Sequence, residues 1–169
     1  IYDKAETPYI QRAMQLALVT GQRRADIAAM QFRDIKDNYL HVRQQKTGAM
    51  VRLSLSLTLE AVSLSLGDVV ATCRDRVISP YLIHHTRNLG QAKAGTPVTP
   101  KAITRAFTQS RDKTGLQWEH PPTFHELRSL SGRLYDKQGI DPQSLLGHKN
   151  AATTALYIDS RGTEWISVG

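Results

Sequence analysis

Apolar residues recur at helical spacing in several parts of the chain, and residues that start or stop helices bound each part. In the first part, Thr7-Pro8 supplies a cap and a proline at the first helical position, and Gly21 stands just past the last turn. Arg23 is therefore expected at a sharp turn between this helix and the next one. The helices predicted before residue 120 cover residues 8–19, 23–30, 65–73 and 99–115.

After residue 120, Pro121-Pro122-Thr123 forms a stiff approach to a helix that ends at Gly139. The predicted buried stripe of this helix is apolar and consists of Phe124, Leu127, Leu130 and Leu134. A short helix is predicted to start at Asp141-Pro142, and a last helix, capped by Asn150, follows it. The tail at 161–169 has no helical spacing, and Trp165, Ile166 and Val168 make it more apolar than a free tail should be, so we expect it to dock on this domain or on another copy.

Strand-like runs flank the turn sequence Gln-Gln-Lys-Thr-Gly at 44–48 and predict a hairpin with Lys46 at or beside its tip. Apolar residues then alternate with Ser or Thr, which is the period of a strand, so extended structure is expected to continue. The segments predicted to be extended are residues 39–42, 50–53, 53–59 and 80–83. The chain is therefore expected to be mainly α with a small antiparallel β-sheet, an α+β fold.

Composition narrows the partners and the compartment. With 169 residues, 40% of them hydrophobic, the chain fits one globular domain, and its formal charge of +7 favours a polyanion such as DNA. The single cysteine, Cys73, excludes a disulfide framework and fits a reducing cytoplasm. Without a leader or an apolar run of roughly 18 residues, a soluble intracellular protein is expected. Because the chain starts at Ile1 and is helical almost at once, we expect a single domain, 1–169, excised from a longer protein.

The candidate chemistry concentrates between residues 123 and 157. Four side chains there suit a phosphodiester: His125, Arg128, His148 and Tyr157. Each has a common structural explanation when taken alone, such as a surface pair, a helix end or a half-buried tyrosine. The same holds for Thr-Gly-Gln-Arg at 20–23 and Lys-Thr-Gly at 46–48, which are usually a helix end and a hairpin turn. Their common order and spacing carry the signal.

The ordered set resembles the tyrosine recombinases, the phage integrase family, and is most similar to the lambda-type integrases. The resemblance runs from Thr-Gly-Gln-Arg-Arg-Ala-Asp at 20–26 through Pro-Pro-Thr-Phe-His-Glu-Leu-Arg at 121–128 to Leu-Leu-Gly-His-Lys at 145–149. The family's six catalytic groups fall on Arg23, Lys46, His125, Arg128, His148 and Tyr157. Asp26 matches an acidic position with which the family holds its active site together. The neighbouring Arg24 falls outside the Thr-Gly-x-Arg register and is expected to point elsewhere.

The resemblance implies a site-specific recombinase that cleaves and rejoins DNA through a 3′-phosphotyrosyl intermediate, without metal, ATP or another cofactor. The implied partners are double-stranded DNA at attachment sites, other integrase protomers in a tetramer on DNA, and accessory DNA-bending proteins. Alone, the chain is expected to be a monomer. The implied location is the cytoplasm of a bacterial host, on the nucleoid and away from membranes. The family's upstream DNA-clamping domain is absent from this sequence, and the tail at 161–169 is able to dock in trans.

The residues also make chemical sense by themselves. Arginine forks at Arg23 and Arg128 would cradle the non-bridging oxygens of a phosphodiester while staying charged. Lys46 is the candidate general acid for the leaving 5′ hydroxyl, because an ammonium gives up a proton more readily than a guanidinium. Tyr157, with an ordinary pKa of about 10, needs a base or a positive field to become a nucleophile. Either histidine is a candidate for moving that proton, and the sequence does not choose between them.

Other chemistries fit the sequence less well. His-Glu-Leu-Arg-Ser at 125–129 lacks the second histidine of a zinc-protease helix, the glycines at 90 and 95 lack the lysine of a P-loop, and no Gly-x-Ser-x-Gly elbow occurs. Two other functions stay open. A type IB topoisomerase would use the same groups to relax supercoils and religate the same strand. A non-catalytic DNA-binding module would use the basic residues only to position phosphates.

Overall fold

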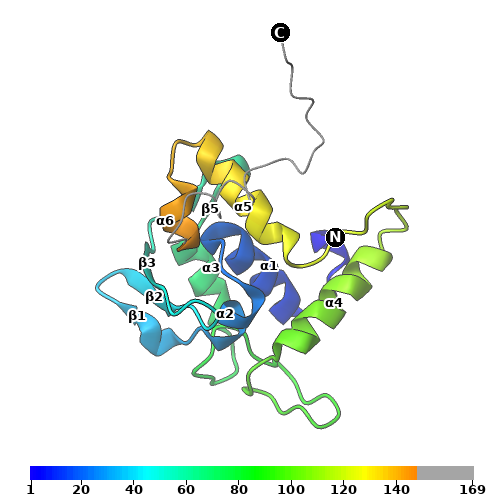
Figure 1. The fold of residues 1–169 in the computed structure, drawn as a ribbon. Coiled ribbons are helices and arrows are strands. Elements are labelled where there is room, and N and C mark those ends of the chain that lie inside the picture. Colours follow the sequence, from blue (N-terminus) through cyan, green and yellow to red (C-terminus); the bar gives the residue numbers. More distant parts are fainter. Residues whose placement is uncertain (148–169) are drawn as a thin grey trace.

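The structure is a computed structural model, and it describes residues 1–147. Its central element is helix α1 (Pro8–Thr20), which the other helices surround (Figure 1). Most of the circumference of α1 is buried, which explains why its apolar residues fill more than one stripe. The buried residues of α1 are Ile10, Ala13, Met14, Leu16, Ala17, Val19 and Thr20. Gly21 ends the helix with a left-handed φ of 63°, as glycine past a helix terminus commonly does.

Five further α-helices are described within these residues, and short 3₁₀ turns join some of the elements. The α-helices are α2 (Arg24–Ala29), α3 (Leu66–Cys73), α4 (Pro100–Asp112), α5 (Glu126–Lys137) and α6 (Pro142–Leu146). The 3₁₀ turns are Tyr2–Lys4, Phe32–Asp34 and Glu60–Val62. The helices predicted before residue 120 are confirmed with shifts of up to three residues at their ends. Two predicted caps are confirmed, since Thr99 accepts a hydrogen bond from the Ala102 amide and Ser65 from the Asp68 amide. Thr7 precedes α1 as predicted, but its side chain makes no capping hydrogen bond.

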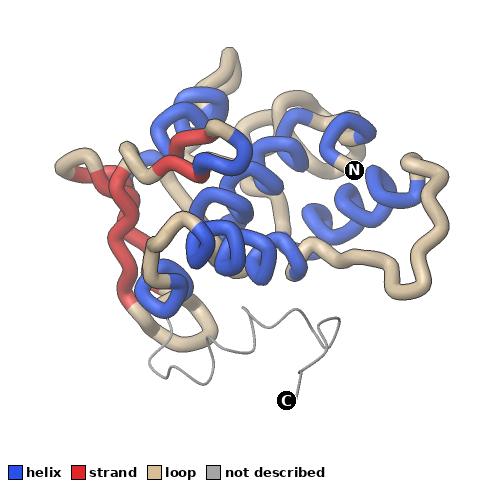
Figure 2. The backbone as a smooth tube through the Cα atoms, turned by 90° about the horizontal axis from the view of Figure 1, so that it is seen from above, coloured by secondary structure: helices blue, strands red, loops and turns tan. Residues whose placement is uncertain are grey.

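A three-stranded antiparallel sheet covers one side of the helices (Figure 2). The strands β1 (Ile35–Lys36), β2 (Tyr39–Arg43) and β3 (Met50–Ser54) lie in that order. The predicted hairpin of β2 and β3 is confirmed, and Leu40 pairs with Leu53. Strand β1 was not predicted. It joins β2 through Asp37 and Asn38, whose φ angles of 49° and 63° make a two-residue hairpin turn.

Two segments predicted to be extended differ from the structure: residues 53–59 are strand only at their two ends, and residues 80–83 form no strand. Residues 53–59 keep the strand period, with Leu53 and Leu59 buried, but the chain turns after Ser54. The carbonyls of Leu55 and Leu57 accept hydrogen bonds from the amides of Gly67 and Leu66, respectively, instead of continuing the β2–β3 ladder. The chain then forms a separate two-stranded ladder of β4 (Thr58–Leu59) and β5 (Leu64–Ser65). Residues 80–83 are buried at Leu82 and Ile83, yet they form a single bridge to the segment after α2 instead of a ladder.

The buried face of α5 also differs from the prediction. Leu130 is exposed, and Leu127 and Leu134 only flank the core. The buried positions are instead Arg128, Ser129, Ser131, Gly132 and Tyr135. The hydroxyl of Tyr135 donates to the Val19 carbonyl at 2.9 Å, so α5 packs closely on the end of α1 through small and polar residues. Burial raises the pKa of Tyr135, which keeps this phenol protonated.

The fold class, mainly α with small antiparallel sheets, is confirmed. None of the helices in residues 1–147 has the length and hydropathy needed to cross a membrane. Cys73 is buried as predicted, and burial raises the pKa of its thiol to about 12. The predicted last helix and the tail at 161–169 lie outside the described residues.

Candidate functional site

Segments far apart in the sequence meet beside the end of α1. They are the turn after α1, the turn between β2 and β3, the start of α5 and the end of α6. Four polar side chains join them, and we call this set the polar hub: Gln22, Arg23, Gln44 and Arg128. Three of the four, Gln22, Gln44 and Arg128, are buried. Because buried polar groups are stable only when hydrogen-bonded, the contacts of the hub fix how these segments lie together.

Arg128 links α5 to the C-terminal ends of α1 and α6. The residue as a whole is only 1% exposed. Nη1 donates to the carbonyl of Gly21, and Nη2 donates to the carbonyl of Leu146 at 2.8 Å. Both carbonyls lie where a helix stops and lack a helical partner, so the arginine satisfies acceptors that helix ends leave open. The plane of the guanidinium is thereby set relative to α1 and α6.

Arg23 and Arg24 are neighbours in sequence but point to different parts of the fold. Arg23 is half-buried at the start of α2, and its Nη1 donates to Oε1 of Gln44 at 2.7 Å. Arg24 is exposed and donates to the hydroxyl of Thr104 on α4. Arg23 therefore joins the hub, whereas Arg24 lies against another helix.

Lys46 lies exposed in the turn between β2 and β3, where the hairpin prediction put it. The turn is held from two sides. Asp26 on α2 is 3% exposed, and its Oδ1 accepts a hydrogen bond from the backbone amide of Gln45 at 2.8 Å. The hydroxyl of Thr47 donates to Oε1 of Gln44 at 2.7 Å. Asp26 thus links α2 to the segment that carries Lys46.

His125 immediately precedes α5 and is exposed, whereas Arg128, three residues later, is buried. The side chain of Glu126 accepts a hydrogen bond from the Thr123 amide at 2.8 Å, which fixes the entry into the helix. The pair expected from the sequence is therefore present at the start of α5, with its members at different depths. His148 and Tyr157 lie outside the described residues. The described chain ends at Gly147, directly after Leu146, whose carbonyl accepts hydrogen bonds from Gln44 and Arg128 of the hub.

Sequence reasoning missed the two glutamines of the hub. Glutamine is usually exposed, so residue type gives no sign of burial. Position did offer one for Gln44, since it continues the inward-facing alternation of Leu40 and Val42 along β2. For Gln22 the sequence offers no comparable signal, because its burial depends on α6 packing over it.

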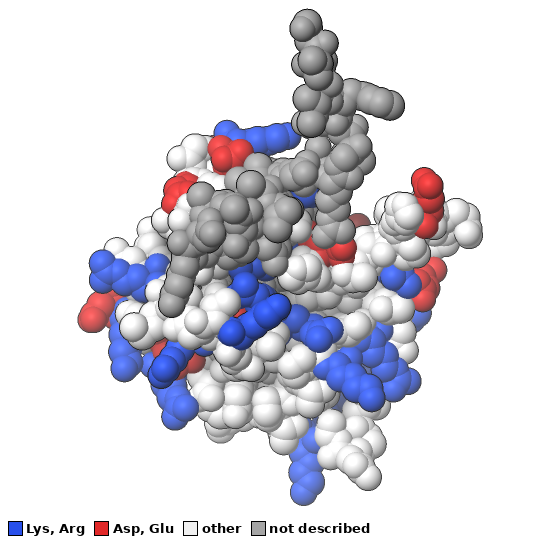
Figure 3. Space-filling model, viewed as in Figure 1, with Lys and Arg blue, Asp and Glu red and all other residues white. Residues whose placement is uncertain are grey.

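Basic side chains spread over the face that Figure 3 shows, from the sheet on the left to α4 on the right. Helix α4 carries three basic residues, Lys101, Arg105 and Arg111. Part of the positive charge behind the formal net charge of +7 therefore lies on this face, and such a basic face attracts polyanions.

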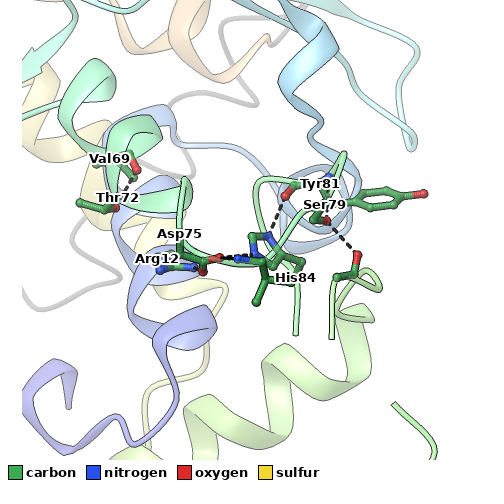
Figure 4. Close-up of polar contacts among 9 residues, drawn as sticks. Arg12, Val69, Thr72, Asp75, Ser79, Tyr81 and His84 are labelled. Carbon is green, nitrogen blue, oxygen red and sulfur yellow. Dashed lines mark hydrogen bonds and ion pairs between the residues drawn. The ribbon is translucent and has the colours of Figure 1, made fainter. Parts of the chain in front are cut away.

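A second polar network lies elsewhere and contains none of the predicted site residues. It consists of Arg12 on α1, Asp75 after α3, and His84, and we call it the His84 cluster (Figure 4). Arg12 pairs with Asp75 at 2.6 Å. Nε2 of His84 lies 3.2 Å from Asp75, and Nδ1 lies 2.9 Å from the carbonyl of Tyr81. Because a carbonyl oxygen can only accept, Nδ1 is the donor in its contact with Tyr81.

The electrostatics of the His84 cluster hold Asp75 ionised. Partial burial pushes the pKa of Asp75 upward, but hydrogen bonds from Arg12, the Val77 amide and His84 outweigh this and lower it below its ordinary value. His85 next to it has a pKa lowered by burial and by the nearby His84. Among residues 1–147, no group of three His, Cys, Asp or Glu side chains is arranged to hold a metal ion.

Comparison with known proteins gives the same family as the motifs. Residues 1–164 match the phage integrase family. The prophage integrase IntE of Escherichia coli strain K12 is 49% identical over 172 residues, which cover 99% of this chain and 46% of IntE. The chain thus spans about half the length of the curated relatives it matches.

Two solved structures of the integrase of phage lambda are similar over 99% of this chain, each with 39% sequence identity. A dimer bound to a COC′ core site gives a TM-score of 0.88 and is covered over 59% of its chain. A tetramer bound to a Holliday junction gives a TM-score of 0.87 and is covered over 48%. On the family match and these similarities, the chain belongs to the phage integrase family.

Proposed function

We propose that this chain is the catalytic domain of a site-specific DNA recombinase for phage or prophage integration and excision. The observation that carries the proposal is the polar hub, which brings Arg23, Arg128 and the turn of Lys46 together from three distant segments. These groups suit metal-independent phosphodiester cleavage, and an ordinary core does not need them in one place.

The proposed first step is attack of the Tyr157 phenol oxygen on the scissile phosphorus. A new bond forms between the tyrosine and the 3′ phosphate, and the bond from phosphorus to the 5′ oxygen breaks. Lys46 donates a proton to the leaving 5′ oxygen, for which an exposed turn is well suited, because the lysine can meet bound DNA. Of His125 and His148, one accepts the phenol proton and the other donates to a non-bridging oxygen.

Arg23 and Arg128 are proposed to stabilise the negative charge that develops on the non-bridging oxygens. Fixed donors aimed at developing charge need no reorganisation during the reaction, and the carbonyl and amide contacts of the hub supply that fixation. Asp26 supports the site by holding the Lys46 turn to α2.

The intermediate keeps the energy of the phosphoester bond in the 3′-phosphotyrosyl link. A 5′ hydroxyl of another strand can attack it and release Tyr157, so that strands are exchanged without ATP or a metal ion. If the 5′ hydroxyl of the same strand always returned, the result would be relaxation, as in a type IB topoisomerase.

We propose that the partners are double-stranded DNA at attachment sites and further copies of the protein. The lambda integrase structures on a core site and on a Holliday junction support this proposal by similarity. A tetramer on DNA, accessory DNA-bending proteins, docking of the tail at 161–169 on a neighbour, and action on the nucleoid in the bacterial cytoplasm belong to the same proposal.

The test is a covalent complex on a nicked attachment-site duplex in EDTA, followed on a denaturing gel. Wild type is expected to stay attached to the 3′ end of the cleaved strand, and Tyr157→Phe is expected to form no adduct. A second labelled duplex then separates recombination from relaxation, because only strand exchange joins the two labels. The proposal fails if wild type forms no adduct, or if Tyr157→Phe still forms one.

A further inference from the structure

The side-chain amide of Gln44 makes all the hydrogen bonds available to it. Nε2 donates to Oε1 of Gln22 and to the carbonyl of Leu146, both at 2.8 Å. Oε1 accepts from Nη1 of Arg23 and from the hydroxyl of Thr47, both at 2.7 Å. A primary amide has two N–H donors and two acceptor sites, so this group is fully satisfied while only 1% exposed.

Gln22 extends the same amide network toward α6. Its Nε2 donates to the carbonyls of Leu145 at 2.9 Å and Thr20 at 3.0 Å. The Leu145 and Leu146 carbonyls end a five-residue helix, where carbonyls have no helical partner. The two glutamines, together with Arg128, therefore fasten the last described turn before His148 to the end of α1.

The backbone leaves room for this arrangement at Gly147. Its φ is 64°, a left-handed conformation, and a Cβ there would lie 2.8 Å from Nε2 of Gln44 and 2.8 Å from Val51. A glycine is thus required both for the conformation and for the close approach of the amide. The chain passes directly over Gln44 on its way to His148.

The oxygen of Gln44 joins two of the proposed catalytic groups. One of its partners is the guanidinium of Arg23, and the other is Thr47, the residue after Lys46. The backbone carbonyl of Gln44 also accepts from the Gly48 amide at 2.8 Å, which closes the Lys46 turn. Gln44 therefore orients the Arg23 guanidinium and also holds the base of the turn that carries Lys46.

We propose that Gln44 is a positioning residue for strand cleavage. It orients Arg23 and the Lys46 turn relative to the end of α6, and it does not contact the reacting atoms. This inference rests on the proposed function, since it gives Gln44 a part in the reaction of that same site. The structural part of the inference is that Gln44 orders the Arg23 side chain, and this can be measured without any DNA cleavage.

The experiment compares Gln44→Met with Gln138→Met in the full chain. Methionine keeps the length of the side chain and removes its hydrogen bonds. Gln138 is a matched control, because its amide donates to the Thr58 carbonyl at 2.9 Å and accepts from the Glu60 amide at 3.1 Å, remote from the hub in sequence and contacts. Thr47→Val is the milder variant, since Thr47 is exposed and its change removes one bond to Gln44 and a longer one, at 3.4 Å, from the Ala49 amide within the same turn.

Single-turnover cleavage is measured at saturating DNA and scaled to the folded fraction. Gln44→Met is expected to cleave roughly 10- to 100-fold more slowly, as for loss of a hydrogen bond to a charged group, with DNA affinity changed less than about threefold. Thr47→Val is expected to lose roughly three- to tenfold, and Gln138→Met to stay within about threefold. Equal rates for Gln44→Met and Gln138→Met would overturn the inference. Unchanged cleavage by Thr47→Val would overturn its part concerning the Lys46 turn.

Nitrogen NMR of the arginine side chains gives the readout that does not depend on cleavage. In wild type, the Arg23 guanidinium is expected to show slow exchange of its Nη hydrogens, and Gln44→Met is expected to abolish this while Gln138→Met preserves it. If wild type fails to cleave yet Arg23 loses its order only in Gln44→Met, the proposed function fails and the structural role of Gln44 stands. An Arg23 signal unchanged in Gln44→Met overturns the positioning role whatever the cleavage assay shows.

Discussion

The polar hub and the His84 cluster both use largely buried polar side chains to hold segments against α1, but their chemistry differs. The His84 cluster contains an ion pair and a histidine beside a carboxylate, which by residue type resembles a catalytic pair. Two members of the hub are glutamines bonded to helix-end carbonyls, which by residue type resemble ordinary structure. Yet the hub is the network that includes Arg23 and Arg128 and holds the Lys46 turn.

The difference shows that residue types alone do not locate a site. The contacts of His84 and Asp75 are taken up by Arg12, the Tyr81 carbonyl and the Val77 amide, so the cluster pins the loop after α3 to α1. The hub, in contrast, joins segments whose sequences carry the expected catalytic groups. Damage to the hub is therefore expected to lower cleavage and stability together, whereas damage to the His84 cluster is expected to lower stability alone.

The largest effect is expected from Arg128→Ala. Cleavage should fall about 100- to 1,000-fold, as for loss of a charge-stabilising donor, and the free energy of unfolding should fall by roughly 2–5 kcal/mol, because the Gly21 and Leu146 carbonyls lose their donor. Urea unfolding and single-turnover cleavage measure the two losses. Arg12→Ala is the control from the other network: it should lose stability but cleave within about threefold of wild type per folded molecule. Comparable cleavage losses in the two variants would erase the distinction between the networks.

Gly147→Ala is expected to have the next largest effect. The left-handed backbone and the contacts at 2.8 Å with Gln44 and Val51 predict a loss of about 2–3 kcal/mol in the free energy of unfolding, together with slower cleavage. Gly115→Ala is a matched control with a φ of 71° and nothing within 4 Å of the added Cβ, so it should cost only about 1–2 kcal/mol and leave cleavage unchanged. Thermal or urea unfolding distinguishes the two. Equal losses would mean that the close approach to the hub is unimportant.

The smallest effect is expected from Asp75→Asn. The lowered pKa of Asp75 means that its contribution to stability is present above the unfolded value of about 3.9 and is lost as the pH falls through the lower, folded value. The variant should therefore be less stable than wild type by about 1–3 kcal/mol at pH 7, and the gap should close below pH 4. Urea unfolding between pH 7 and pH 3 tests this. A gap that widens as the pH falls would contradict the assigned role, and so would a large loss of cleavage at pH 7.

Local sequence signals predicted much of the fold. Helix caps such as Thr99-Pro100 and stop signals such as Gly21 act within a few residues, so the helices they bound could be placed from the sequence. The β2–β3 hairpin could be predicted for the same reason, because its turn sequence at residues 44–48 is also a local signal. The turn at Asp37-Asn38 also had a local signal, two residues that tolerate positive φ, and the missed strand β1 could have been predicted from it.

Features that depend on tertiary packing could not be predicted in this way. The leucines of α5 indicated the wrong face, because α5 packs with Ser131 beside Gly21 and Gly132 beside Leu146 of α6, and it buries Arg128 against two carbonyls. The spacing of apolar residues cannot predict that an arginine is buried when its hydrogen-bond partners are distant in the sequence. For the site, motif spacing identified the candidates Arg23, Lys46, His125 and Arg128, while the contacts that hold them became visible only in the folded chain.

The most direct test of the account uses the two adjacent arginines, which have equal charge but different partners. Arg23 bonds to Gln44 in the hub, and Arg24 bonds to Thr104 on α4. Single-turnover cleavage at saturating DNA should fall about 100- to 1,000-fold in Arg23→Ala, whereas Arg24→Ala should keep its cleavage rate within about threefold and lose mainly DNA affinity. Equal losses of the cleavage rate in the two variants, or a larger loss in Arg24→Ala, would contradict the claim that the polar hub builds the site of strand cleavage.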